Sequence, residues 1–162
     1  MAVENVTKIS IDTPEEPAEI GAIERSTSEL VIGLVGAVGA GVSTTAKELA
    51  TLLSRDYGYG EVTIVKISDI IRANAEKVLV DVPATDGSKR ILDLQKAGTK
   101  LRDKFGDDYL AGKVIEEIGI SRHSAGGYEK TQGASLPKPI RRVTIIDSLK
   151  HQEESRILRE TY

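Results

Sequence analysis

The sequence contains no cysteine. This absence excludes disulfide bonds, a thiol nucleophile and a cysteine-ligated zinc site, and it permits a reducing compartment such as the cytosol. Only two histidines are present, which leaves little for metal chemistry. The N-terminus lacks the apolar core of a signal peptide, and no run approaches the roughly 18 apolar residues of a membrane helix. We therefore expect a cytoplasmic chain without a membrane partner.

An excess of positive charge is also missing, since the formal net charge is -3 and the pI is about 5.5. Electrostatic capture of nucleic acid needs lysine and arginine clustered on one face. We therefore expect no nucleic-acid partner, whereas free nucleotides remain candidate ligands.

With 162 residues, 40% of them apolar, the chain has the length of one ordinary domain with a real core. Residues 1–28 hold Pro14 and Pro17 among several glutamates, without sustained periodicity. This composition predicts a mobile N-terminal arm. A segment that binds a partner or a second copy of the chain is the alternative. Residues 29–162 are expected to form one domain.

A strand, a glycine-rich loop and a helix follow one another near the start of this domain. Residues 30–35 are apolar on both alternating faces, which is typical of a buried parallel strand. The phosphate-binding pattern G-x-x-x-x-G-K-[ST] is met at Gly36, Gly41 and Ser43. Val42 occupies the lysine position, so the loop is a P-loop without its lysine.

Such a loop binds phosphate through backbone N–H groups and the positive end of the helix dipole, neither of which needs a lysine. Phosphoryl transfer usually does need it, because the lysine neutralises charge on the β- and γ-phosphates. A turn that only packs strand against helix is the alternative. The residues predicted to bind the nucleotide here are Gly36, Ala37, Val38, Gly39, Ala40, Gly41, Val42, Ser43 and Thr44.

Periodicity along the rest of the chain indicates an α/β fold with a parallel sheet, of which three strands are expected. We predict strands at 30–35, 61–67 and 142–147. We predict five helices. The first begins near Ser43, and the second follows a cap at Ser68 or Asp69. The third runs over 89–105 and ends at Gly106, the fourth follows a cap at Asp107, and the last lies within 150–162. Loops are expected at 81–88 and, as a flexible loop or lid, at 119–141.

The third predicted strand ends in a carboxylate, Asp147, and so has the form of a Walker B strand. In a P-loop sheet this strand ends beside the phosphate loop, which would bring Asp147 close to Ser43. We expect both residues to hold Mg²⁺ that accompanies a bound nucleotide. A strand-terminal aspartate that only caps the next helix is the alternative.

Three arginines, Arg72, Arg90 and Arg102, lie on the helices between the second and third predicted strands. A second phosphate could dock there, and Arg102 is the preferred anchor because Gly98 and Thr99 precede it. Solvated surface charge is the alternative for each. His151 begins a His-x-Glu pattern, but a zinc deaminase site also needs Pro-Cys-x-x-Cys, so we interpret His151 as a surface or helix-start residue.

Four segments together resemble a known family. It is the N-terminal P-loop domain, similar to nucleoside monophosphate kinases, of bacterial anti-phage dCTP deaminases. The segments are Gly36 to Thr45, Ile67 to Arg72, Leu94 to Arg102 and Ile146 to His151.

The resemblance implies a P-loop, three-layer fold with strand order 2-3-1-4-5, of which this chain supplies strands one to three. Strand one would then be an unpaired edge, and the domain would be incomplete at its C-terminus. The implied function is a nucleotide-binding regulatory domain for a deoxycytidine-nucleotide deaminase, joined in cis or in trans. The deaminase site and its zinc are not in this chain, and no catalytic residue is assigned.

A deoxynucleoside monophosphate kinase is the second hypothesis. It would recruit Lys47, Lys150 or a loop lysine in place of Val42, with Ser43 and Asp147 holding magnesium. Whether the chain is an enzyme is therefore left open by its sequence.

Overall fold

The computed structural model describes residues 29–83, 87–131, 134–138 and 140–162. The predicted mobile arm, residues 1–28, lies outside the described residues. The elements, in chain order, are β1 (Glu29–Val35), α2 (Val42–Asp56), β2 (Glu61–Lys66), α3 (Ile67–Asn74), the 3-10 helix η1 (Ala75–Val78), α4 (Ser88–Phe105), α5 (Tyr109–Ser124), β3 (Tyr128–Thr131), β4 (Ala134–Pro137), β5 (Arg142–Leu149) and α6 (Gln152–Thr161).

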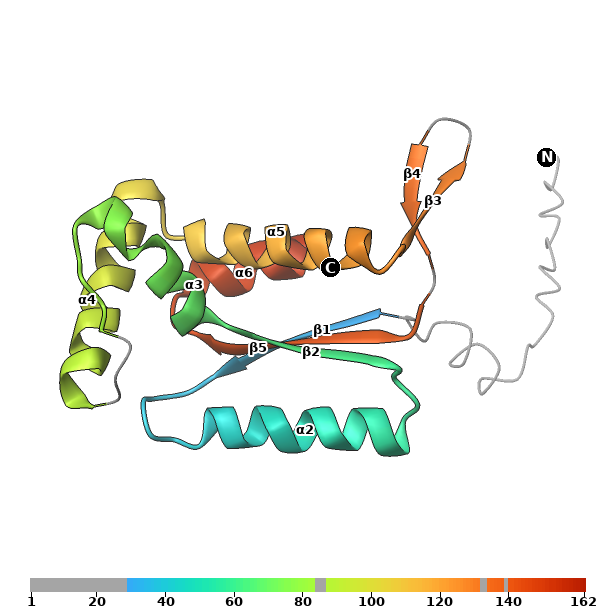
Figure 1. Ribbon diagram of the computed structural model, residues 1–162, viewed down its shortest axis with the longest axis horizontal. Coiled ribbons are helices and arrows are strands. Elements are labelled where there is room, and N and C mark those ends of the chain that lie inside the picture. The colour runs from blue at the N-terminus through green and yellow to red at the C-terminus, as the bar shows by residue number, and fades with distance from the viewer. Residues whose placement is uncertain (1–28, 84–86, 132–133, 139) are drawn as a thin grey trace, which may run out of the picture.

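The core is a three-stranded parallel sheet in the order β1-β5-β2. Helix α2 covers one face of this sheet, and α5 and α6 lie on the other (Figure 1). The α/β class is therefore confirmed, and in the described sheet β1 is an edge strand, as expected. The central position of β5 explains why Val143, Ile145 and Ile146 place apolar side chains on both faces, because a strand flanked on both sides and covered on both faces is buried on both alternating sets.

Two apolar cores form on the two faces of the sheet. Val143 and Ile145 of β5 pack with Ala46 and Leu53 of α2. Ile146, on the alternate face, packs in the larger cluster with residues of α3, α4, α5 and α6. This alternation follows from the period of two along a strand. It leaves the carboxyl ends of the strands between α2 on one side and α3 and α4 on the other.

Helix boundaries agree with the periodicity to within a few residues, but two predicted caps are wrong. Helix α3 begins at Ile67, with Lys66 rather than Ser68 or Asp69 at the N-cap. Helix α5 has Asp108 at its N-cap, without a side-chain capping bond, in place of Asp107. In both places the predicted cap lies one to three positions from the observed N-cap, because several capping residues compete in one short stretch.

The prediction of a flexible loop or lid at 119–141 is also wrong. Helix α5 continues to Ser124, and β3 and β4 then form an antiparallel hairpin with Tyr128 opposite Pro137. The glycine-rich composition concealed this, because a helix tolerates an interior Gly119 at a modest cost and short strands carry little periodic signal. The third core strand is also longer than predicted, since β5 runs on to Leu149.

Candidate nucleotide-binding cleft

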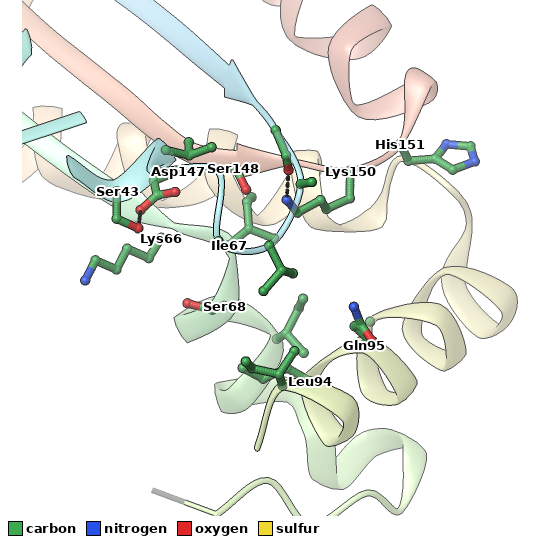
Figure 2. Close-up of a pocket in the computed structure, with 18 of the residues that line it drawn as sticks. Ser43, Lys66, Ile67, Ser68, Leu94, Gln95, Asp147, Ser148, Lys150 and His151 are labelled. Atoms are coloured by element: carbon green, nitrogen blue, oxygen red, sulfur yellow. Dashed lines mark hydrogen bonds between the residues drawn. The ribbon is translucent and has the colours of Figure 1, made fainter. Parts of the chain in front are cut away.

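A cleft of about 1220 Å³ opens at the carboxyl ends of the sheet strands. Its walls are the loop after β1, the beginning of α3, one face of α4 and the turn between β5 and α6 (Figure 2). In parallel α/β sheets, loops at the carboxyl ends of the strands are the usual place for ligands. The cleft is larger than many small-molecule sites.

The floor of the cleft is the glycine-rich loop and the N-terminus of α2. Gly39 has φ +82° and Gly41 has φ +77°, left-handed conformations that favour glycine. Gly41 is the N-cap of α2, with no side-chain capping bond and no acidic residue in the first turn. The first N–H groups of any helix lack partners within the helix. Here they lie where the dipole favours an anion.

Val42 has a structural role within this loop. A Cβ built on Gly36 would lie 2.5 Å from Val42 Cγ2, so the valine side chain packs over the first glycine. The residue at the lysine position therefore fills space and carries no charge into the cleft. Glycine suits position 36 because a methyl group there would meet Val42, and one of the two side chains would have to shift.

Ser43 and Asp147 meet as the topology predicts. The Ser43 hydroxyl donates a hydrogen bond of 2.6 Å to Asp147 Oδ2, although 104 positions separate the residues. The register of the sheet causes this, because Asp147 pairs with Leu34 of β1 and with Lys66 of β2. Asp147 is 8% exposed, so its carboxylate lies at the bottom of the cleft.

The residues around Asp147 fit a Mg²⁺ ion that also takes ligands from a bound phosphate and from water. Within the described ranges, no group of three or more histidine, cysteine, aspartate or glutamate side chains could hold a metal ion. Magnesium, however, is often held by one or two protein oxygens together with water and substrate phosphates. The Ser43 hydroxyl and the Asp147 carboxylate supply that minimum, so they fit Mg²⁺ that arrives with a phosphate ligand.

Lys150 enters the site from the turn between β5 and α6. Its Nζ donates a hydrogen bond to the carbonyl oxygen of Gly36, at the start of the loop (Figure 2). Helix α6 holds this turn in place, because the Lys150 backbone N–H donates a hydrogen bond of 2.8 Å to Glu154 Oε2. Lys47, the other lysine considered at this position, is exposed on α2 and is not among the residues that line the cleft.

Arg102 lines the cleft from α4 and is held by a buried ion pair. Its Nε and Nη2 donate to Glu154 Oε1 at 2.9 and 2.6 Å. The Arg102 side chain is 13% exposed and that of Glu154 is 0% exposed. Arg102 therefore connects α4 to α6 as well as facing the cleft.

The other sequence-predicted residues divide into two groups. Arg90, Gln95 and Thr99 line the cleft. Arg72 does not, and forms an exposed ion pair of 3.0 Å with Asp69 on its own helix. Gly98 is buried, and its missing side chain also makes room for α3, since a Cβ there would lie 3.1 Å from Ile71 Cδ1. Of the predicted loop residues, Ala40 alone is not among those that line the cleft.

His151 is a helix-start residue, as predicted. It is the N-cap of α6, and its Nδ1 accepts a hydrogen bond of 3.3 Å from the Glu153 N–H. Glu154 accepts from the His151 N–H at 3.1 Å, which completes a capping box. Glu154 is the residue that the sequence reasoning missed. Its position three residues after the N-cap, the glutamate position of a capping box, was the available signal.

None of the helices in the described part of the chain is both long and apolar enough to cross a membrane. Searches against protein-family models, curated proteins and solved structures found no match to this chain.

Proposed function

We propose that residues 29–162 form a nucleotide-binding domain of the P-loop type. The loop at 36–44 would hold the phosphates, and Ser43 and Asp147 would hold Mg²⁺ bound to them. One observation carries this proposal: an uncapped helix N-terminus opens into the cleft next to a serine hydroxyl that bonds a buried carboxylate at 2.6 Å. The N–H groups would take phosphate oxygens, and the oxygen pair would take the cation that accompanies them.

The role that fits an uncharged Val42 is binding without turnover. Backbone N–H groups and the helix dipole remain for affinity, whereas the charge that stabilises phosphoryl transfer is missing from its usual position. Together with the resemblance described above, this favours a regulatory domain that senses a deoxynucleotide. Its occupancy would set the activity of a deoxycytidine-nucleotide deaminase in cis or in trans during anti-phage defence.

Calorimetric titration with each of the four deoxynucleoside triphosphates, with Mg²⁺ and with EDTA, tests the proposal. Saturable heat with at least one of them is expected. Two exposed threonines on α2 give a matched pair of variants, because Thr44→Glu adds a carboxylate in the first turn and Thr51→Glu adds one further along. Acidic residues near a helix N-terminus favour the helix, so Thr44→Glu should stay folded while it repels phosphate.

The expected result is loss of binding in Thr44→Glu and retention in Thr51→Glu, with both variants folded by circular dichroism. Folded wild-type protein that gives no saturable heat with any of the four triphosphates would refute the proposal. Equal binding by the two variants would place the phosphates elsewhere.

A deoxynucleoside monophosphate kinase is the second candidate. The size of the cleft and the contact of Lys150 with the loop favour it. A coupled assay for ADP formation with each deoxynucleoside monophosphate distinguishes the two functions. The sensing function predicts no ADP above the hydrolysis control, whereas turnover that Ser43→Ala abolishes would establish the kinase.

A further inference from the structure

We infer that Lys150 supplies a positive charge that binds the phosphate chain at the start of the loop, away from the usual lysine position, and that the site consequently selects nucleoside di- and triphosphates over monophosphates. This inference rests on the proposed function. It assigns a phosphate-contacting role to a residue 108 positions after Val42 in the sequence, on a different turn of the fold.

The first argument is where the ammonium group lies. Lys150 is exposed and lines the cleft, and its Nζ donates to the Gly36 carbonyl. A lysine ammonium has three donors, so a single carbonyl leaves donors for a ligand. A phosphate oxygen is a better acceptor than a neutral carbonyl, because charge-assisted hydrogen bonds are about twice as strong as neutral ones.

The second argument is that the turn carrying Lys150 is fixed. The preceding residue, Leu149, is buried and pairs with Val35 of β1, after a shift in register between Leu34 and Val35. The following residue, His151, caps α6. The backbone N–H groups of Lys150 and His151 both donate to Glu154, which is fully buried and paired with Arg102. The base of the lysine side chain is therefore positioned before any ligand arrives.

The third argument excludes the other nearby lysines. Lys47 does not line the cleft. Lys66 does line it, but Figure 2 shows its amine end directed away from Lys150 and from the loop contact. Among the labelled side chains of the cleft, the lysine that meets the glycine-rich loop is Lys150 (Figure 2).

The selectivity for longer phosphate chains follows from the positions of the phosphate-binding groups at the two ends of the glycine-rich loop. The α2 N–H groups lie at its end, beside Ser43, whereas Lys150 contacts Gly36 at its start. Figure 2 shows Ser43 and the Lys150 amine on opposite sides of the loop. In this arrangement one phosphate group occupies the helix N-terminus, and a second one further along the same chain meets the ammonium.

The absence of cysteine allows a direct test. In the variant Lys150→Cys, the introduced thiol is the one cysteine of the chain, and 2-bromoethylamine converts it into a side chain with an amine at nearly the length of lysine. Iodoacetamide gives a neutral side chain as the control. Lys47→Cys and Lys66→Cys, treated in the same way, are the matched variants.

The measurement is the dissociation constant for inorganic tripolyphosphate, orthophosphate, and each deoxynucleoside triphosphate with its monophosphate. We expect Lys150→Cys to bind triphosphates about tenfold more weakly than wild type, which corresponds to one charge-assisted contact. Monophosphate affinity should change by less than twofold. Aminoethylation should restore the preference for triphosphate, and carbamidomethylation should not.

Several results would overturn the inference while leaving the proposed function intact. These are unchanged triphosphate binding in Lys150→Cys, equal loss for mono- and triphosphates, or a loss in Lys47→Cys or Lys66→Cys instead. Wild-type protein that binds none of the phosphate compounds would overturn the proposed function and the inference together.

Discussion

Glu154→Gln removes the charge from the most connected carboxylate of the described chain while keeping its size. Glu154 accepts four hydrogen bonds, two from Arg102 on one oxygen and two from the backbone N–H groups of Lys150 and His151 on the other. Glutamine replaces one oxygen with an NH₂ group, which cannot accept. Whichever way the amide turns, one pair of donors loses its acceptor, and the buried Arg102 loses its counter-ion.

The expected loss of stability is large. Breaking a buried ion pair by removing one partner costs about 3–5 kcal/mol, because the other charge stays buried without compensation. A chain of this length shifts its Tm by about 2–4 °C per kcal/mol, so we expect Glu154→Gln to lower the Tm by roughly 6–20 °C. That loss is comparable with a large part of the 5–15 kcal/mol that stabilises a typical domain.

The neighbouring glutamate provides the control. Glu153 pairs with Arg156 at 2.7 Å, but the two side chains are 37% and 51% exposed. Exposed pairs contribute about 0.2–1 kcal/mol, so Glu153→Gln should lower the Tm by no more than about 4 °C. Thermal unfolding followed by circular dichroism compares the two variants.

Equal shifts in Glu153→Gln and Glu154→Gln would refute the reasoning that burial decides the energy of these carboxylates. A second measurement uses Arg102→Met combined with Glu154→Gln. Removing both charges should cost less than the sum of the single changes, because no uncompensated charge remains. Additive losses would show that the pair does not couple α4 to α6.

Three further predictions follow from the site and from helix α5. Gly36→Ala should destabilise the chain by about 1–3 kcal/mol in urea unfolding and weaken triphosphate binding, because its methyl group would meet Val42 at 2.5 Å. Asp147→Asn should abolish the effect of Mg²⁺ on triphosphate binding in calorimetry, since it removes the anionic ligand. In an NMR titration, Glu117 should show a raised pKa, mainly through partial burial, and Glu116 a lowered pKa, mainly through a hydrogen bond from a lysine. Glu117 thus contributes stability that is lost as the pH rises through its raised pKa. Glu116 contributes stability that is lost as the pH falls through its lowered pKa.

Each of these has a matched control. Gly60→Ala introduces the same methyl group where no atom lies within 4 Å, so its stability and binding should match wild type. Asp103→Asn removes a carboxylate from the α4 wall of the cleft and should keep the Mg²⁺ effect. Triphosphate binding that is the same with Mg²⁺ and with EDTA in wild type would contradict the magnesium assignment. Coincident titrations of Glu116 and Glu117 would contradict the pKa prediction.

The sequence by itself determined the local elements and one long-range contact. Residues 30–35 are predicted to form a strand because burial on both faces leaves a continuous apolar run. The strands at 61–67 and 142–147 are predicted from alternating apolar residues and from an apolar segment that leads to an acidic end. Ser43 could be placed beside Asp147 because parallel strands of a known order bring their carboxyl ends together, and no side-chain detail enters that argument. The hairpin at 128–137 was not predicted, because a strand of four residues is too short to show a clear alternation of apolar and polar residues among glycines and prolines.

Only the tertiary structure decided which charges reach the cleft. Arg102 looked like a ligand anchor, but its guanidinium is also held by Glu154, 52 positions away on α6. Lys150 was one of several lysines, until the register of β5 and the cap of α6 placed it against Gly36. The sequence pattern around a flexible, charged side chain does not indicate which residue it will contact. Its contacts depend on how separate helices and strands pack.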